Sequence, residues 1–430
     1  MKKHFNVFLI IGLFGLILIM GCTNSNRGSN SGDLLSTFGT NGIVIDNGAA
    51  GGNSDDGGRA IAVLADKIYV AGYSNNGDAN VLAIWSFNSD GTKNTSFGDN
   101  GKVIYDSKES NIWPKIDIDS DGNIYVLAPS YDNDLDIIIL KFDRNGNFDS
   151  NFGSNGVVTW DGGNGDDVGY NFYISENNIF IVGISKNASG NFDLIILSLN
   201  KINGNIVTTI TWNSDYNLND YGFDIWVEPD GNILVCGAVE ISKDNYSTLL
   251  LKFTANGYLD TSFGNNGQVV VDGYAFRGVM AINEDGEIFL TGGFENDDGY
   301  DMIMMKFRED GSLSSNFGNN GILVIDKLVA KSDVDYGEDI VIDSNGKILI
   351  TGEGTSDDGK IVMVVLKLNS DGTRYASFGN NGIAIFSYSS VTDGKDYGRA
   401  IAIDANGYII VTGETYNGTD YDLILWKIMP

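Results

Sequence analysis

Histidine is nearly absent from this chain of 430 residues, because the single one, His4, lies close to the first residue. The rest of the sequence therefore offers no Ser-His-Asp or Cys-His catalytic unit and no histidine-ligated zinc site. Cysteine is also scarce. Only Cys22 and Cys236 are present, too few for the disulfide framework that stabilises many small exported domains. Cys236 lies in an apolar segment, and we expect it to be a buried structural thiol.

Positively charged residues are also scarce. The 27 lysines and arginines face 57 aspartates and glutamates, which gives a formal net charge of −30 at pH 7. Nucleic-acid backbones are bound through clusters of lysine and arginine, and the sequence contains no such cluster, so we expect no nucleic-acid partner. The acidity favours solubility and mutual repulsion of an exported protein. Calcium coordination and capture of a basic partner are the functional alternatives.

The N-terminus has the pattern of an export signal. Lys2 and Lys3 precede an apolar run, and the run ends in Ile19-Met20-Gly21-Cys22, which resembles the lipobox of bacterial lipoproteins. The resemblance implies cleavage before Cys22 and lipid attachment to this residue, and several acyl chains anchor a protein durably. An uncleaved membrane anchor is the alternative, although the run is short for a span of about 20 residues.

These features predict three segments. Residues 1–21 form a lipoprotein signal peptide, residues 22–34 contain the lipidated cysteine and a flexible polar tether, and residues 35–430 form the folded domain. The expected location is the bacterial membrane, with the outer membrane or the cell surface as the site of anchoring. The membrane is therefore one predicted partner, through the N-terminal lipid.

One phrase recurs along the chain at intervals of roughly 55 to 60 residues, with one interval about twice as long. The phrase is Ser/Asn-Phe-Gly-x-Asn-Gly or a close variant, and its phenylalanines are Phe38, Phe97, Phe152, Phe263, Phe317 and Phe378. The long interval contains a degenerate seventh unit. Such repeats are typical of stacked or radial arrays, so we treat residues 35–430 as one domain.

Each repeat contains four short apolar segments separated by turn residues. In the last copy, segments 398–404, 408–413 and 422–428 follow one another, and a fourth type of segment comes after each Phe-Gly phrase, as at 267–272. Asn-Gly and Asp-Gly between such segments supply the positive φ that tight hairpins need. Many segments are apolar on both faces, which predicts antiparallel sheets covered on both sides. Four-stranded sheets packed face to face around an axis form a β-propeller.

The third type of segment occurs seven times, which predicts an all-β, seven-bladed β-propeller. The chain begins with a fourth-type segment, 37–46, and ends with a third-type segment, 422–428. We therefore expect the N-terminal strand to complete the last blade. This closure removes a free sheet edge and joins the two ends of the ring. We expect the propeller to be a monomer.

The phrases above, together with the Lys-Phe pairs at 141–142, 252–253 and 306–307, resemble the delta-60 repeat family of bacterial β-propellers. The resemblance covers nearly all of the chain after residue 34. It implies the same fold and an exported or surface-associated protein. The family has no common activity, so no catalytic residue is assigned through it.

An aspartate stands two residues before the glycine that opens the innermost strand in five repeats, at Asp56, Asp167, Asp220, Asp335 and Asp396. In one interpretation each carboxylate accepts hydrogen bonds from backbone N–H groups of its own turn. In the other, the five form a ring at the channel mouth that binds a cation or a polar ligand. Asn111 and Phe276 depart from the pattern.

Tyrosines accompany these aspartates on the predicted loop face. Three of them, at Tyr221, Tyr336 and Tyr397, directly follow an aspartate. A tyrosine ring with a polar tip is suited to stacking on a sugar, and equally to packing against its neighbours. We include these residues with the five aspartates as candidate ligand-binding residues.

Two segments resemble parts of calcium sites. Asp117, Asp119 and Asp121 match the first half of a calcium loop, but position 12 is Ala128 where a bidentate glutamate is needed. Asp161-Gly162-Gly163-Asn164-Gly165-Asp166-Asp167 resembles a glycine-rich calcium turn without tandem copies. We therefore expect no cofactor, with calcium as the alternative.

The sequence favours a lipid-anchored, non-catalytic binding or scaffold module. Its acidic, tyrosine-bearing loop face would contact a protein partner or a surface glycan. No enzymatic activity is expected, because the chain carries no catalytic motif. The alternative is a carbohydrate-active enzyme, a glycoside hydrolase or lyase, that uses two carboxylates.

Overall fold

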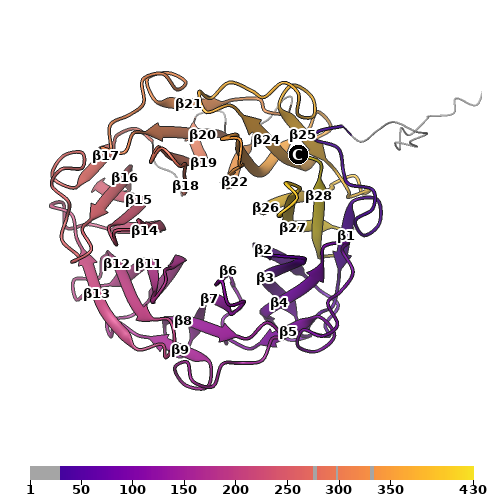
Figure 1. Ribbon diagram of the computed structural model, residues 1–430, viewed down its shortest axis with the longest axis horizontal. Coiled ribbons are helices and arrows are strands. Elements are labelled where there is room, and N and C mark those ends of the chain that lie inside the picture. The colour runs from indigo at the N-terminus through magenta and orange to yellow at the C-terminus, as the bar shows by residue number, and fades with distance from the viewer. Residues whose placement is uncertain (1–29, 275–277, 297–298, 330–333) are drawn as a thin grey trace, which may run out of the picture.

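The computed structural model describes residues 30–430 except 275–277, 297–298 and 330–333. The signal peptide, Cys22, most of the tether and Phe276 therefore lie outside the described residues. Within them the chain forms seven four-stranded antiparallel sheets arranged around a central channel (Figure 1). The predicted all-β, seven-bladed propeller is confirmed.

We number the blades in chain order, and each is given from its innermost to its outermost strand. Blades 1 to 4 contain β2 (Asp56–Leu64), β3 (Lys67–Asn75), β4 (Asn80–Asn88), β5 (Lys102–Tyr105); β6 (Lys115–Ile118), β7 (Ile124–Tyr131), β8 (Leu135–Phe142), β9 (Val157–Trp160); β10 (Asp167–Ile174), β11 (Asn178–Lys186), β12 (Phe192–Asn200), β13 (Ile206–Trp212); and β14 (Asp220–Val227), β15 (Ile233–Ser242), β16 (Asn245–Phe253), β17 (Gln268–Val271). Blades 5 to 7 contain β18 (Val279–Ile282), β19 (Ile288–Asn296), β20 (Gly299–Phe307), β21 (Ile322–Ile325); β22 (Asp335–Ile342), β23 (Ile348–Thr355), β24 (Ile361–Leu368), β25 (Ile383–Phe386); and β26 (Asp396–Ile403), β27 (Ile409–Tyr416), β28 (Tyr421–Ile428), β1 (Ile43–Asp46).

The ring is closed by its two ends. β1 pairs with β28 in an antiparallel register that sets Ile43 opposite Trp426, and it thereby becomes the outer strand of blade 7. An isolated bridge between Leu34 and Ile428 extends this pairing toward the N-terminus. The predicted closure by the N-terminal strand is confirmed, and it leaves no blade with three strands.

The repeated phrase packs the outer part of each blade. Its six phenylalanines are at most 2 % exposed. The lysine of each Lys-Phe pair is also buried, and its ammonium pairs with a carboxylate: Lys141 with Asp149 at 2.9 Å, Lys252 with Glu228 at 2.8 Å and Lys306 with Glu287 at 2.9 Å. A buried charge is tolerated where it is paired and hydrogen-bonded. These residues therefore build the frame of the propeller rather than its contact surfaces.

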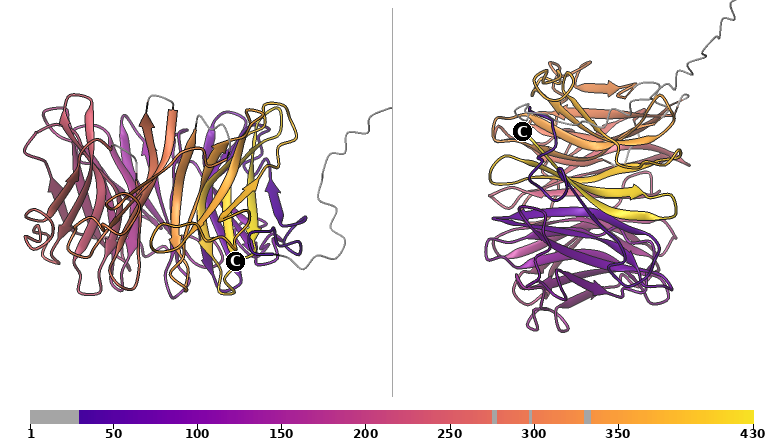
Figure 2. Two further views of the ribbon diagram at one scale, coloured as in Figure 1. Left: turned by 90° about the horizontal axis from the view of Figure 1, so that it is seen from above. Right: turned by 90° about the vertical axis from the view of Figure 1, so that its right-hand side faces the viewer.

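The strands run along the propeller axis, so the loops gather on two opposite faces (Figure 2). We call the loop face the one at which the innermost strands begin. The register places the end of the second strand and the start of the third there too, because Asp56 lies opposite Ser74 and Ser74 opposite Val81. The turns between third and fourth strands, which carry the Phe-Gly phrase, lie on the other face.

A bulge at the start of the innermost strand determines which side chains enter the channel. In blades 1, 3, 4, 6 and 7 the register shifts by one residue directly after the opening glycine, as between Gly398 and Ala400. The extra residue, Arg399 in blade 7, is left without a partner and is turned toward the axis. The carbonyl of Tyr397 then lies 1.7 Å from where a Cβ at Gly413 would be, so the second strand requires glycine there.

Candidate functional site

The five predicted aspartates each occupy the first position of an innermost strand, and all five are 0 % exposed. Each accepts a hydrogen bond from a backbone N–H of the loop that precedes its strand. The donors are Gly48 for Asp56, Gly162 for Asp167, Ser214 for Asp220, Leu328 for Asp335, and Tyr388 and Ser389 for Asp396. The capping interpretation therefore accounts for all five, and we call them the cap aspartates.

Burial raises the pKa of four of the five cap aspartates. Desolvation raises the pKa of Asp56, Asp167 and Asp396 above the usual range, although the hydrogen bonds that they accept oppose the shift. The pKa of Asp220 rises to about 6 through desolvation, with added repulsion from Asp193 and Glu240. A macromolecular partner at the loop face cannot contact these oxygens directly.

The three predicted tyrosines lie half-buried beside the cap aspartates and contact residues of the bulge. Tyr221 stacks on Phe223 with ring centroids 5.8 Å apart. The guanidinium of Arg399 lies 4.2 Å from the ring centroid of Tyr397. Tyr336 lines a cavity in the channel. These tyrosines are thus brought to the channel mouth, where the sequence placed them, but the carboxylates beside them point into the loops.

The calcium candidates in blade 2 do not converge. Asp119 is buried and uses its oxygens on the N–H groups of Asp121 and Asn123 and on the Asn123 side chain. Asp343 and Asp404 hold the same turn in blades 6 and 7. Asp117 lies on β6, and partial loss of its hydration raises its pKa to about 6. Within the described chain, these three aspartates do not form a group of carboxylates spaced for a metal ion.

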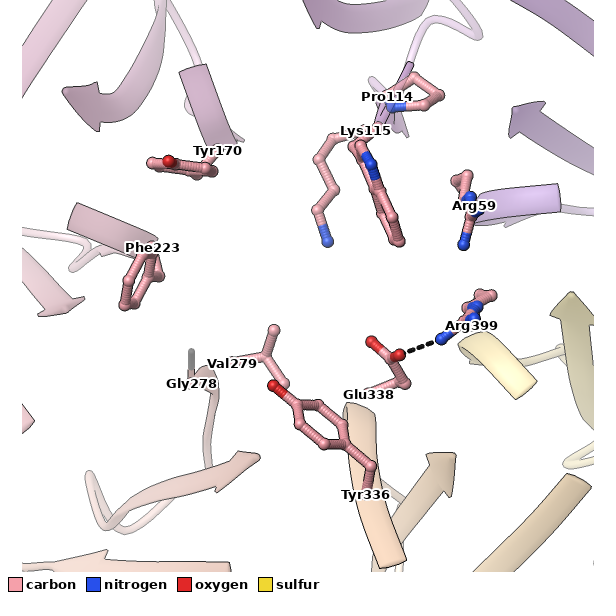
Figure 3. Close-up of a pocket in the computed structure, with 11 residues that line it drawn as sticks. Arg59, Pro114, Lys115, Tyr170, Phe223, Gly278, Val279, Tyr336, Glu338 and Arg399 are labelled. Carbon is pink, nitrogen blue, oxygen red and sulfur yellow. Dashed lines mark hydrogen bonds and ion pairs between the residues drawn. The ribbon is translucent and has the colours of Figure 1, made fainter. Parts of the chain in front are cut away.

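The bulge residues meet at a cavity of about 220 Å³ near the loop-face end of the channel (Figure 3). Each blade contributes to its wall. The lining residues are Arg59, Trp113, Pro114, Lys115, Tyr170, Phe223, Gly278, Val279, Tyr336, Glu338 and Arg399. Figure 3 shows the Lys115 side chain extending toward the centre, with Tyr170 and Phe223 across the cavity from Arg59 and Arg399. We call this space the channel cavity.

A network of charges holds two of these residues in place. Arg59 pairs with Glu414 at 2.7 Å, and Arg399 pairs with Glu338 and lies 3.4 Å from Glu353. Glu414 joins the two halves, because its other oxygen lies 3.9 Å from Arg399. The residues come from blades 1, 6 and 7, so the network ties the closing blade to its two neighbours.

Burial also changes the pKa of one carboxyl group in this network. Desolvation raises the pKa of Glu353 well above its usual range, the nearby Glu338 adds to the shift, and Arg399 opposes it. Glu353 is therefore held largely protonated at neutral pH, so one of the three carboxyl groups does not offset the two arginines. Arg59, Arg399 and Lys115 thus bring positive groups to the wall of the channel cavity, and the buried Asp224 and Asp339 lie near enough to Lys115 to interact with its charge.

Aromatic rings form the rest of the wall. The Arg59 guanidinium lies 3.8 Å from the ring centroid of Trp113, which is 40 % exposed. Tyr170 and Phe223 meet edge to face at 5.4 Å. Exposed aromatic faces beside charged hydrogen-bonding groups are the combination that polar ligands with an apolar side, such as sugars, require.

The channel cavity was not predicted from the sequence. Its residues differ in type from blade to blade, so no motif marks them. The available signal was their position, since each bulge residue directly follows the opening glycine of the repeated Asp-x-Gly pattern. The residue directly after this glycine, whatever its type, is Arg59, Tyr170, Phe223, Glu338 or Arg399 in the five blades with a bulge.

No helix in the described part of the chain is long and apolar enough to cross a membrane. This concerns residues 30–430 without the three short gaps, so the proposed leader is outside it.

Three segments of the chain, residues 65–97, 228–263 and 344–378, match the family model described as a domain of unknown function (DUF5122) beta-propeller. Each match spans the second strand, the third strand and the Phe-Gly phrase of one blade, in blades 1, 4 and 6. The matches support a bacterial β-propeller repeat family. No curated protein matches the chain.

Several solved structures are similar to the whole propeller. The polysaccharide lyase Uly1 has a TM-score of 0.51 at 12 % identity and covers 86 % of this chain and 90 % of its own. A protein of unknown function from Dyadobacter fermentans has a TM-score of 0.48 at 10 % identity, with coverage of 90 % and 98 %. Extracellular domains 1-2 of Drosophila Semaphorin 1b have 0.46 at 9 % identity, with coverage of 91 % and 88 %. At such low identity the likeness shows the fold alone.

Proposed function

We propose that this propeller is an exported, non-catalytic binding module and that its channel cavity holds a saccharide unit of a surface glycan. The observation that carries the proposal is the wall of the cavity, where four aromatic side chains from four blades face charged groups from four blades. A sugar ring presents C–H groups to an aromatic face and hydroxyl groups to charged neighbours. The volume of about 220 Å³ is below the range typical of drug-sized ligands and suits a single saccharide unit.

The acidic loop face, which the sequence suggested as a surface for a protein partner, supports the proposal less well. The cap aspartates are buried and committed to backbone N–H groups. Arg59 retains two guanidinium nitrogens, Nε and Nη1, without a hydrogen-bond partner in the described residues. The channel cavity therefore has buried donor groups that a ligand could use.

The position of the chain entry agrees with a lipid anchor at Cys22, within a delta-60-type lipoprotein. Gly379 donates its backbone N–H to the carbonyl of Ser31, and Gly32 donates to that of Met429, both on the face opposite the loop face. A tether from this point would leave the channel cavity pointing away from the membrane. Mass spectrometry of the protein from a lipoprotein-producing bacterium should show acyl chains on Cys22, and C22S should move the protein from the membrane to the soluble fraction.

Binding to a broad glycan array tests the proposed ligand, with the chain from residue 23 onward as the probe. We expect saturable binding to one sugar class and a loss of at least tenfold in affinity for Trp113→Ala, since this exposed ring can be removed without opening the core. Tyr258→Ala is the matched control. Tyr258 is 76 % exposed and lies in a turn on the other face, so its loss should leave binding unchanged.

Two results would overturn the proposal. An array on which the folded wild-type chain binds no sugar would shift the proposal to a protein partner. Equal loss of binding in Trp113→Ala and Tyr258→Ala would show that the channel cavity is not the site.

The alternative, a carbohydrate-active enzyme, rests on Glu338 and Glu353. Burial holds Glu353 protonated, Glu338 forms an ion pair with Arg399, and glycoside hydrolysis uses two carboxyl groups in different environments. Glu353 is 8 % exposed and does not line the cavity, which favours the non-catalytic proposal. Release of new sugar ends from a bound polysaccharide, abolished in both Glu338→Gln and Glu353→Gln, would establish the enzyme instead.

A further inference from the structure

The junction between blades 2 and 3 brings three carboxylates together. Asp136 lies on β8, Asp161 directly follows β9, and Asp167 opens β10. One oxygen from each lies within 4.8 Å of the other two. The group is on the loop face, away from the channel cavity, and the loop before Asp167, residues 161–166, contains three glycines.

Two of the three carboxylates have an oxygen without a hydrogen-bond partner. Asp167 is 0 % exposed, and its Oδ2 accepts the N–H of Gly162, but Oδ1 is buried without a partner of normal geometry. The Ser185 hydroxyl lies near enough to favour the charged form of Asp167. Oδ1 of Asp136 is likewise buried and unpartnered. Burial of such an oxygen is costly unless something positive satisfies it.

A buried cap oxygen without a partner also occurs at Asp56 and Asp220, so the difference between the junctions lies at the position of Asp136. The aspartates that correspond to Asp136 receive a hydrogen bond from an asparagine amide at the end of the preceding hairpin strand. The pairs are Asn187–Asp193 at 2.8 Å, Asn296–Asp301 at 2.7 Å and Asn417–Asp422 at 3.1 Å. No such amide bond to Asp136 occurs in the described chain, and its hairpin reads Asp132-Asn133-Asp134.

The residue that directly follows the fourth strand varies among the junctions, and it is aspartate at Asp106, Asp161, Asp272 and Asp326. It is Asn47 at the junction of blades 7 and 1, and Asn213 at that of blades 3 and 4. At the junction of blades 5 and 6 it is Asp326, which pairs with Lys327 at 2.7 Å. At the junction of blades 2 and 3, no lysine or arginine among the described residues forms an ion pair with any of the three carboxylates. The nearby Lys186 instead places its ammonium 5.9 Å from the ring centroid of Phe192.

The three carboxylates lie close enough to repel one another, because one oxygen of each is within 4.8 Å of the other two. A divalent cation would remove both the repulsion and the missing hydrogen bonds at once. Calcium is the cation that suits this set, because it takes carboxylate and backbone carbonyl oxygens in flexible geometry, and a glycine-rich loop can supply the carbonyls.

We propose that Asp136, Asp161 and Asp167 bind a Ca²⁺ ion that joins blades 2 and 3. The ion takes the place that an asparagine amide or a lysine takes at the sister junctions. The site is independent of the proposed glycan binding, since none of its residues lines the channel cavity.

Isothermal titration of the chelator-treated chain from residue 23 onward with CaCl₂ tests the site. We expect one ion per chain with a Kd between about 10 µM and 1 mM, the range between sensor and extracellular sites. The melting temperature should rise by about 2–5 °C when calcium is in large excess over Kd, because only the folded state has the site. EDTA should reverse the rise.

Asp161→Asn is the decisive variant, because it copies the residue present at two sister junctions and replaces an exposed side chain. It should weaken calcium binding at least tenfold while its melting temperature in EDTA equals or exceeds that of the wild type, since repulsion is lost. Asp326→Asn at the junction of blades 5 and 6 is the matched control and should bind calcium normally. Absence of binding at 10 mM CaCl₂, or wild-type affinity in Asp161→Asn, would overturn the proposal.

Discussion

Two positions of the innermost strand lie three residues apart and differ in what fixes them. The first is the cap position, occupied by aspartate in five blades, where the carboxylate accepts N–H groups of the preceding loop. The second is the position that lines the channel cavity, which is the bulge residue in five blades, and along the seven blades it is occupied by Arg59, Pro114, Tyr170, Phe223, Gly278, Glu338 and Arg399. The same backbone thus carries one position that local hydrogen bonds dictate and another that nothing local dictates.

This contrast separates the frame from the site. A cap aspartate satisfies donors within its own loop, so it recurs for the same reason in each of the five blades that carry it. A bulge residue leaves the ladder and points to the axis, so its side chain can vary without loss of pairing. Positions that repeat should therefore affect stability, and positions that vary should affect ligand binding.

The largest loss should come from removing a repeated strand. Deletion of residues 35–46 takes β1 from blade 7 and exposes the edge of β28. We expect the melting temperature to fall by ten degrees or more, measured by circular dichroism, because a four-stranded blade and the ring closure are lost together. An unchanged melting temperature would mean that closure does not stabilise the ring.

The next largest effect is expected at the glycine opposite the bulge. Gly413→Ala sets a Cβ against the Tyr397 carbonyl and should cost about 1–3 kcal/mol in urea unfolding, or more if the bulge cannot relax. Blade 2 has Ala128 at this position, and Ala128→Gly is the control. It should cost only about 0.5–1 kcal/mol, from backbone entropy. Equal costs would show that the bulge does not impose the glycine.

Loss of one cap should have a similar or slightly smaller effect. Asp396→Ala leaves the N–H groups of Tyr388 and Ser389 without their acceptor and should cost about 1–3 kcal/mol. Asp393→Ala removes an exposed carboxylate from the same loop and should change stability by less than about 0.5 kcal/mol. The measurement is the difference between the urea unfolding midpoints of the two variants. Equal midpoints would contradict the capping role of Asp396.

A cap aspartate should also give stability a specific pH dependence. The folded-state pKa of Asp220, about 6, lies above its usual value of 3.8. The folded protein therefore binds more protons than the unfolded chain between these pH values, so this residue's contribution to stability is complete below pH 4 and declines as pH rises through 6. Asp220→Asn should remove that decline. Parallel stability curves for wild type and variant between pH 4 and 7 would contradict the assignment.

The smallest effect on stability is expected at the bulge. Phe223→Ala removes the edge-to-face contact with Tyr170 and should cost about 0.5–1.5 kcal/mol. The same change should reduce binding of the sugar that the array identifies at least tenfold. A variant that loses stability like Gly413→Ala but keeps its sugar affinity would reverse the distinction between frame and site.

Much of the fold could be predicted because the repeat is local. Asn-Gly and Asp-Gly turns, apolar runs of strand length and the Phe-Gly phrase each act within one blade, and the sequence type of the first and last segments indicated how the ring closes. The cap role of Asp56 and its counterparts was one of two interpretations, and only their burial distinguished them.

The channel cavity depended on the ring as a whole. Arg59 and Glu414 belong to opposite ends of the sequence, and Arg399 meets Glu338 from a different blade. No spacing in the chain records these contacts, because the radial packing of seven blades creates them. By itself the sequence determined the blades, their number and their closure, since turns and strand pairing are set by neighbouring residues. Only the tertiary structure decided which side chains share the axis and which carboxylates remain without a partner, because both depend on groups that the closed ring brings together from distant repeats.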